Sequence, residues 1–164
     1  MKFLKRNRAY FILLLAILVV DQVTKYLALG HLTLHETQWI FPNWLGLTLV
    51  FNEGAAWSFL AGNRWLLVMI SIVTATGFSI WFIRSEHRWQ RLSLAVIVAG
   101  AIGNLIDRLF VGYVVDFFDF NLLDYLTFGN PFPIFNIADM AIVCGMIGLA
   151  ITVFFEKDPE HERK

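Results

Sequence analysis

The chain has 164 residues and a formal net charge of zero; 58% of its residues are apolar and only 16% are charged. Its mean hydropathy is +0.64, whereas soluble domains carry about 25% charged residues. This composition excludes an ordinary soluble domain, and the balanced charge gives no reason to expect binding to nucleic acid. The only cysteine, Cys144, excludes an intramolecular disulfide and a cysteine-based zinc cluster.

Four apolar stretches are each long enough to cross a bilayer, which takes about 20 helical residues. Backbone polar groups in lipid must be satisfied within the segment, so we expect each stretch to be a helix. The expected spans are residues 10–29, 65–83, 92–110 and 137–155. They predict an all-α membrane protein with a four-transmembrane-helix bundle. Residues 1–164 would form a single integral membrane domain that ends in a cytoplasmic tail, 156–164.

The basic residues predict the orientation of the bundle. Ten of the 13 lysine and arginine residues precede the first span, separate the second from the third, or follow the fourth. The positive-inside rule therefore places both termini in the cytoplasm and connections 30–62 and 111–136 outside. A cleaved signal peptide, with a weak cleavage site at residues 28–30, is the alternative for the first span. A signal h-region does not normally continue through an Asp and a Lys, which disfavours it.

The outward connections predict some structure of their own. Runs of β-forming residues at 38–41 and 47–51 flank a turn, which indicates a small hairpin or sheet. Residues 55–60 are typical of a short interfacial helix with Trp57 and Phe59 as anchors. We expect an irregular loop over residues 119–135, because glycine and proline interrupt it.

Small residues at a spacing of four predict close contact between the third and fourth spans. Ala95, Ala99 and Gly103 form such a stripe, and Ala141 and Gly145 form another. In lipid, small residues allow helix backbones to approach each other closely. This packing should bring the outer ends of the two spans together.

Polar side chains gather in the outer half of the spans, where they are costly. Ionisable groups within membrane spans indicate function by default. The expected layer comprises Asp21, Lys25, Asn104, Asp107, Arg108 and Asp139, bordered by Asn52, Asp116 and Asn136.

Structural interpretations of these residues remain open. Asp21 and Lys25 are four residues apart and could simply pair, and Asp107 with Arg108 could mark a helix end. Asn136 and Asp139 have the spacing of a capping box. Asp116 is harder to assign a purely structural role, because apolar residues flank it on both sides.

Asp116 and Asp139 are the candidate catalytic pair on position alone. They flank the loop between two spans whose outer ends should meet. Two carboxylates held close in a low-dielectric site share a proton. Such a pair can deprotonate water and protonate a leaving amine, as in aspartic proteases.

Other functions have weaker support. His31 and His35 lack a clear third metal ligand, Cys144 has no histidine in any span, and no nucleotide-binding loop occurs. A proton-coupled carrier would also use intramembrane carboxylates, but we find no internal repeat. A non-catalytic assembly factor with an aromatic outer face is a further alternative.

Five short motifs in order resemble the lipoprotein signal peptidase (signal peptidase II) family, aspartic endopeptidases of bacterial inner membranes. The motifs are DQVTK at 21–25, FNEGAAWS at 51–58, GNLIDR at 103–108, GYVVDF at 112–117 and FNIAD at 135–139. Each is weak alone, but their order within the predicted topology is specific. Departures from the family pattern are Trp57, Met140 and residues 109–110, and none of them alters the carboxylates.

The resemblance implies a role for ten residues. Asp116 and Asp139 would be catalytic. Substrate-binding or supporting positions would be Asp21, Lys25, Asn52, Gly54, Asn104, Arg108, Asn136 and Ala138. Residues 38–61 would form an extracytoplasmic β-cradle and an interfacial helix. We further expect Arg108 to pair with Asp21 and brace the site.

The resemblance also implies the substrate, a prolipoprotein whose lipobox cysteine carries a diacylglyceryl group. The enzyme would cut before that cysteine, at the periplasm-facing side of the bacterial inner membrane. Membrane lipids and the cyclic-peptide inhibitors of the family would be its other partners. We expect a monomer with no metal, no cofactor and no nucleic acid.

Overall fold

The structure is a computed structural model that describes residues 2–54, 62–127 and 131–155. Its four long helices are α1 (Lys2–His31), α2 (Arg64–Arg84), α3 (Arg88–Phe110) and α4 (Ile137–Phe155). All four are long and apolar enough to cross a membrane, which confirms the expected bundle. The helix α1 begins at Lys2 rather than at residue 10, because the lysines and arginines before the apolar run are good helix formers.

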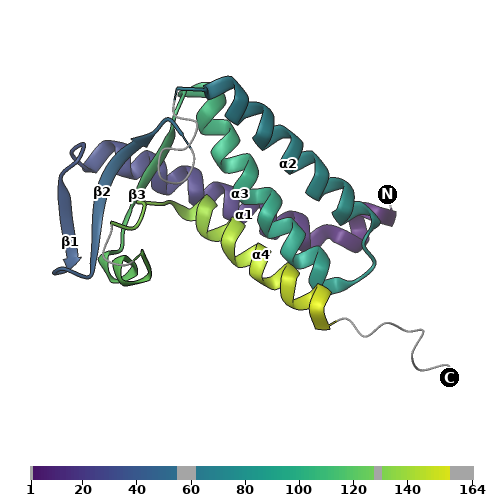
Figure 1. The fold of residues 1–164 in the computed structure, drawn as a ribbon. Coiled ribbons are helices and arrows are strands. Elements are labelled where there is room, and N and C mark those ends of the chain that lie inside the picture. Colours follow the sequence, from purple (N-terminus) through teal and green to yellow (C-terminus); the bar gives the residue numbers. More distant parts are fainter. Residues whose placement is uncertain (1, 55–61, 128–130, 156–164) are drawn as a thin grey trace.

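The helix α3 lies at the centre of the bundle and packs against α1, α2 and α4 (Figure 1). Its contact with α4 is close. A Cβ atom on Gly145 would lie 2.6 Å from Cγ1 of Ile97 and 2.9 Å from the carbonyl oxygen of Ser93. The expected packing through small residues is therefore confirmed, and it fixes the start of α4 beside the last turns of α3.

A small antiparallel sheet lies at one end of the bundle (Figure 1). Its strands are β1 (Thr37–Phe41), β2 (Leu45–Asn52) and β3 (Val114–Asp119), in the order β1-β2-β3. The expected hairpin is confirmed as β1 and β2, while β3 joins from the connection between α3 and α4. Within the second connection a 3-10 helix, η2 (Asn121–Thr127), replaces part of the expected irregular loop. The interfacial helix expected at 55–60 falls outside the described residues.

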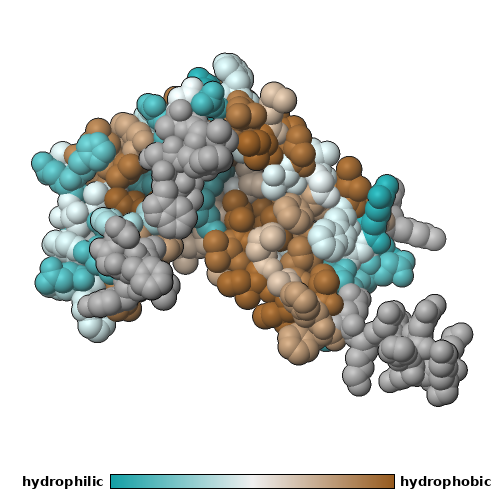
Figure 2. Space-filling view, viewed as in Figure 1, coloured by the Kyte–Doolittle hydropathy of each residue, from teal (hydrophilic) through white to brown (hydrophobic). Residues whose placement is uncertain are grey.

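The sheet is fixed to the bundle by an apolar cluster. Ala28 of α1, Leu49 of β2, and Val115 and Phe117 of β3 are all buried and pack together. Apolar side chains cover the helices in Figure 2, and hydrophilic ones gather around the sheet. The cluster therefore places β3, with Asp116, against the end of α1.

Candidate active site

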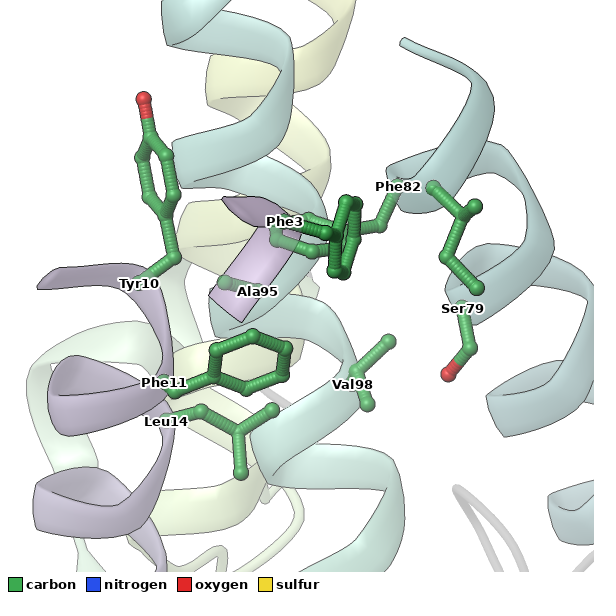
Figure 3. Close-up of a pocket in the computed structure, with 9 residues that line it drawn as sticks. Phe3, Tyr10, Phe11, Leu14, Ser79, Phe82, Ala95 and Val98 are labelled. Atoms are coloured by element: carbon green, nitrogen blue, oxygen red, sulfur yellow. The ribbon is translucent and has the colours of Figure 1, made fainter. Parts of the chain in front are cut away.

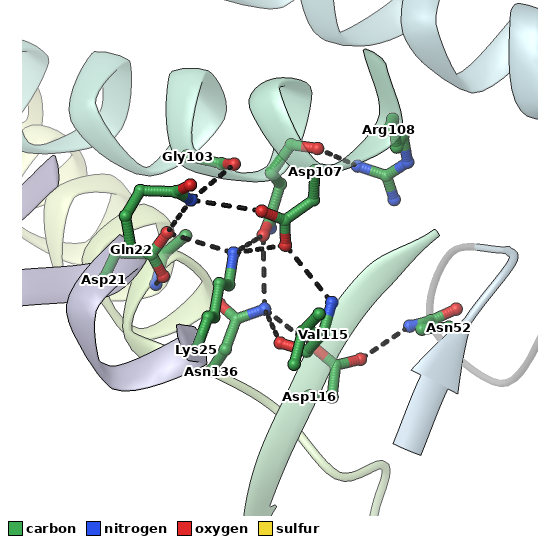
Figure 4. Close-up of polar contacts among 12 residues, drawn as sticks. Asp21, Gln22, Lys25, Asn52, Gly103, Asp107, Arg108, Val115, Asp116 and Asn136 are labelled. Atoms are coloured by element: carbon green, nitrogen blue, oxygen red, sulfur yellow. Dashed lines mark hydrogen bonds and ion pairs between the residues drawn. The ribbon is translucent and has the colours of Figure 1, made fainter. Parts of the chain in front are cut away.

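Asp116 is buried on β3 and receives one hydrogen bond on each carboxylate oxygen. Its side chain is 1% exposed. Asn52 donates from Nδ2 to Oδ2 at 2.9 Å, and Asn136 donates from Nδ2 to Oδ1 at 2.6 Å (Figure 4). Asn52 comes from the end of β2, which pairs with β3. Three separate segments therefore hold this carboxylate in place.

Asp139 lies in the first turn of α4, where the expected capping box is present. The backbone N–H of Asp139 donates to Oδ1 of Asn136 at 2.9 Å, and the N–H of Asn136 donates to Oδ2 of Asp139 at 3.3 Å. Asn104 donates from Nδ2 to the other carboxylate oxygen at 2.7 Å. The positive end of a helix dipole also favours an anion at this position.

Asn136 connects the two carboxylates. Its Oδ1 faces the N–H of Asp139, so its Nδ2 points the other way, to Asp116. Asn104 is oriented similarly, because Lys25 donates to its Oδ1 at 2.9 Å and leaves Nδ2 for Asp139. Each amide thus donates to one carboxylate of the pair, Asn136 to Asp116 and Asn104 to Asp139.

Burial raises the pKa of Asp116 to about 7, and the negative charge of Asp139 adds to the increase. The hydrogen bonds from Asn52 and Asn136 favour the carboxylate and act in the opposite direction. A carboxyl group that titrates near neutral pH can hold or release a proton under ordinary conditions, which suits acid–base catalysis.

A buried ionic cluster supports this pair from α1 and α3. Lys25 Nζ lies 3.0 Å from Oδ2 of Asp21 and 2.9 Å from Oδ2 of Asp107. The pairing of Asp21 with Lys25, which the sequence left open, is present. The other oxygen of Asp21 accepts the N–H of Ala138 at 2.9 Å. Asp21 therefore links α1 to the first turn of α4.

Ala138 must be small at this point. It is fully buried, and its carbonyl oxygen and side chain lie against Gly100 and Gly103 of α3. A Cβ atom on Gly103 would come within 2.6 Å of Oδ2 of Asp21. Because Gly103 has no side chain, Asp21 can reach the start of α4 even though α3 and α4 are in close contact.

Arg108 does not pair with Asp21, so that expectation was wrong. Its Nη2 donates to the carbonyl oxygen of Gly54 at 3.0 Å, and Nη1 lies 3.5 Å from the carbonyl oxygen of Asn104. Among the described residues its Nε is buried without a hydrogen-bond partner. Asp21 is already bonded to Lys25 and Ala138, so Arg108 instead connects α3 to the segment that follows β2.

Gly54 is held near Asp116 through Asn52. Its N–H donates to Oδ1 of Asn52 at 2.9 Å, while Nδ2 of the same amide binds Asp116. All the residues that the sequence placed at the site therefore lie in one connected network. Arg108 is part of it through Gly54 rather than through the expected partner, Asp21. Among the described residues no group of three or more His, Cys, Asp and Glu side chains could hold a metal ion.

Two residues of this network were not among the ten expected site residues. Gln22 donates from Nε2 to Oδ2 of Asp21 at 3.0 Å and to Oδ1 of Asp107 at 3.1 Å. Asp107 also accepts the backbone N–H of Val115, next to Asp116. Asp107 belonged to the expected polar layer, but its contact with β3 depends on a strand that was not predicted. A run of apolar and β-branched residues at 114–118 was the available signal.

Comparison with known proteins places this chain in a family. The family model for signal peptidase (SPase) II matches residues 13–155. The lipoprotein signal peptidase of Latilactobacillus sakei subsp. sakei is 39% identical over 93% of this chain and 98% of its own length. That of Pseudomonas putida is 38% identical over 94% of this chain and 93% of its own.

Solved structures agree with the sequence relatives. One bacterial membrane enzyme superimposes with a TM-score of 0.83 and 31% identity, over 92% of both chains. A second gives 0.80 and 32% identity, over 91% of this chain and 94% of the other. Sequence and fold lead to the same assignment: this multi-pass membrane protein belongs to the signal peptidase II family of lipoprotein signal peptidases.

Proposed function

We propose that the chain removes signal peptides from prolipoproteins, with Asp116 and Asp139 as the catalytic pair. The observation that carries the assignment is the bridge through Asn136, whose side chain binds both Asp116 and the N–H of Asp139. The substrate is a prolipoprotein whose lipobox cysteine carries a diacylglyceryl group. Cleavage falls at the peptide bond before that cysteine.

The two carboxyl groups have different roles at the start of the reaction. Asp139, at the helix start, is ionised and takes a proton from a water molecule. The water oxygen bonds to the carbonyl carbon of the scissile peptide. Asp116, protonated at pH values below about 7, donates its proton to the carbonyl oxygen. The tetrahedral intermediate then breaks its C–N bond as the proton on Asp139 passes to the leaving amine. One hydroxyl group of the intermediate returns its proton to Asp116, so the product is a carboxylic acid and the pair regains its starting state.

The remaining polar residues hold the pair and the segment around it. Asn104, Asn52 and Asn136 donate to the carboxylates and receive none of the transferred protons. Lys25 and Asp21 fix Asn104 and the start of α4. Arg108 and Gly54 lie beside Asn52, where we place the backbone of the substrate. No metal or cofactor takes part in this scheme.

We propose that the sheet and the site face the periplasmic side of the inner membrane and that both termini are cytoplasmic. The distribution of basic residues supports this orientation. The lipidated cysteine and the signal helix are both lipid-soluble, so they can reach the site laterally from the bilayer. A monomer suffices for this function, and the cyclic-peptide inhibitors of the family should compete with the substrate.

An apolar layer argues against the carrier alternative. Below the site, Phe82, Leu94, Ile97 and Leu149 form a buried cluster between the helices. A proton or solute pathway would need polar groups through the depth of the membrane. A protease needs them only at the level of the scissile bond.

A cleavage assay with a diacylglyceryl-modified lipobox peptide tests the proposal. Asp116→Asn and Asp139→Asn should each lower kcat by about 10²–10⁴-fold, the usual contribution of acid–base catalysis. Asp119→Asn is the matched control, because Asp119 lies on the same strand but binds Thr48 at 2.7 Å instead of the pair. The kcat of this control variant should lie within a few-fold of that of the unmodified chain. Full activity in either member of the pair would refute the assignment.

A further inference from the structure

An apolar groove lies at the end of the bundle opposite the sheet. We call it the distal groove; its walls come from α1 and α2, and α3 forms its floor. Its volume is about 130 Å³, and residues that line it include Phe3, Phe11, Leu14, Ser79, Phe82 and Val98 (Figure 3). Apolar cavities of similar size in proteins take up a hydrocarbon such as benzene. The helices that form the groove are surrounded by lipid acyl chains in the bilayer, so the groove suits one acyl chain.

A buried arginine lies on α3 near the distal groove, towards the end of the bundle. Arg91 lies one helical turn before Ala95, which lines the floor. It is 6% exposed. Its Nε donates to the carbonyl oxygen of Ser85 at 2.6 Å, and Nη1 donates to Oδ1 of Asn7 at 3.2 Å. This guanidinium therefore connects α3 to α1 and to the residue that follows α2.

The charge of Arg91 has no acidic counterpart in the part of the chain that the structure describes. The ion pairs found there involve Lys25 with Asp21 and Asp107, at the other end of the bundle. Exposed arginines lie at the same end of the bundle, near the start of α1 and on both sides of the turn between α2 and α3: Arg6, Arg8, Arg84 and Arg88. Glu86, also exposed, is the acid on that turn. The positive potential there favours an anionic group.

We propose that the distal groove and its arginines form a binding site for an anionic phospholipid. One acyl chain would lie in the groove, and the phosphate would contact Arg84 and Arg88, with buried Arg91 adding positive potential behind them. Basic pockets between transmembrane helices bind anionic headgroups in this way. The signal helix of a substrate is a poorer occupant, because its own N-terminal region is positively charged. The site is distinct from the catalytic pair, and the inference does not depend on the proposed cleavage.

Lipid titration of the purified full-length protein, followed by native mass spectrometry, tests the proposal. Phosphatidylglycerol should bind more tightly than phosphatidylcholine with the same acyl chains. One basic residue near an anionic surface contributes about 1 kcal/mol, or about fivefold in affinity. The double variant Arg84→Gln/Arg88→Gln should therefore weaken phosphatidylglycerol binding by about 25-fold and leave phosphatidylcholine binding unchanged. Cleavage of the lipobox peptide by this variant should be normal, which verifies its fold.

Two further variants separate the groove from general charge. Arg163→Gln/Lys164→Gln removes the same charge from the chain end and should keep the preference for phosphatidylglycerol. Ser79→Phe fills the groove and should weaken both lipids alike. Equal affinity for the two lipids, or equal effects of the two double variants, would overturn the proposal. The proposal would also be overturned if a synthetic signal peptide displaced phosphatidylglycerol and bound more tightly to Arg84→Gln/Arg88→Gln than to the unmodified chain.

Discussion

The carboxylate of Asp107 holds the strand that carries Asp116, because its Oδ2 accepts the backbone N–H of Val115 at 3.2 Å. The same oxygen lies 2.9 Å from Nζ of Lys25, and Oδ1 accepts a hydrogen bond from Gln22 at 3.1 Å. Through one side chain, α1 and α3 are both connected to the residue that precedes Asp116. This contact sets the position of β3 relative to the start of α4.

We predict that Asp107→Asn lowers kcat/KM by about 100-fold, since a misplacement of about 1 Å can cost that much. The amide of the variant cannot pair with Lys25 and accept the N–H of Val115 as the carboxylate does. Steady-state kinetics with the lipobox peptide will measure this, with Gln22→Ala as a milder variant that keeps the strand contact. If Asp107→Asn kept the kcat/KM of the unmodified chain, Asp107 would not position Asp116.

The pH profile should report the ionisation of Asp116. The pKa of this group is raised to about 7 by burial and by the charge of Asp139. If Asp116 must be protonated when the reaction begins, kcat/KM should fall as the pH rises through about 7. Asn52→Ala removes a donor that favours the carboxylate, so the pKa should rise and the fall should move to higher pH. Thr48→Val, on the same strand as Asn52, should not change the pH at which kcat/KM falls.

The same shift predicts the sign of the stability change. The pKa of Asp116 is higher in the folded state than its ordinary value of 3.8. The proton-linked contribution to stability is therefore fully present below about 3.8 and is lost as the pH rises through about 7. Thermal unfolding in detergent at several pH values will measure this contribution, and Asp116→Asn should reduce its pH dependence. An unchanged dependence in that variant would contradict the assigned pKa.

Gly103→Ala should lower both stability and activity. The added Cβ would lie 2.6 Å from Oδ2 of Asp21 and 3.2 Å from Cβ of Ala138. Overpacking of this kind typically costs about 1–3 kcal/mol, and it would displace the carboxylate that binds the start of α4. Gly77→Ala is the matched control, because its Cβ would meet no atom within 4 Å. Equal unfolding temperatures for the two variants would show that the close contact tolerates a methyl group.

Arg64 connects the start of α2 to the end of α3. Its Nε donates to the carbonyl oxygen of Arg108 at 2.7 Å, and Nη2 donates to that of Leu109 at 2.8 Å. These carbonyls lie at a helix end and lack partners within the helix. Arg64→Gln should destabilise the protein by about 1–3 kcal/mol, the typical effect of unpaired polar groups. Arg64→Lys should rescue little, because one ammonium group cannot match the planar two-donor geometry; full rescue would show that charge alone matters.

The four helices were predictable because the physical requirement is local. A run of apolar residues must lie in lipid, and its backbone must then be helical, whatever the rest of the chain does. The hairpin of β1 and β2 and the capping box at Asn136 and Asp139 were also predictable, since each depends on residues close in sequence. The five motifs were enough to identify the family.

Contacts between distant segments could not be predicted in this way. Arg108 was expected to meet Asp21, but Asp21 is taken up by Lys25 and Ala138, and Arg108 binds the carbonyl of Gly54. The position of Asp107 against Val115 depends on β3 pairing with β2, a register that no local pattern specifies.

The sequence by itself determined which groups are buried in an apolar environment, because hydrophobicity and spacing are properties of short segments. Tertiary structure decided which of those groups face each other. Each carboxylate and amide in a low-dielectric interior takes the nearest partner that the packing of α3 against α1 and α4 provides. Asn136 comes to bridge Asp116 and Asp139 because three separate segments converge on it.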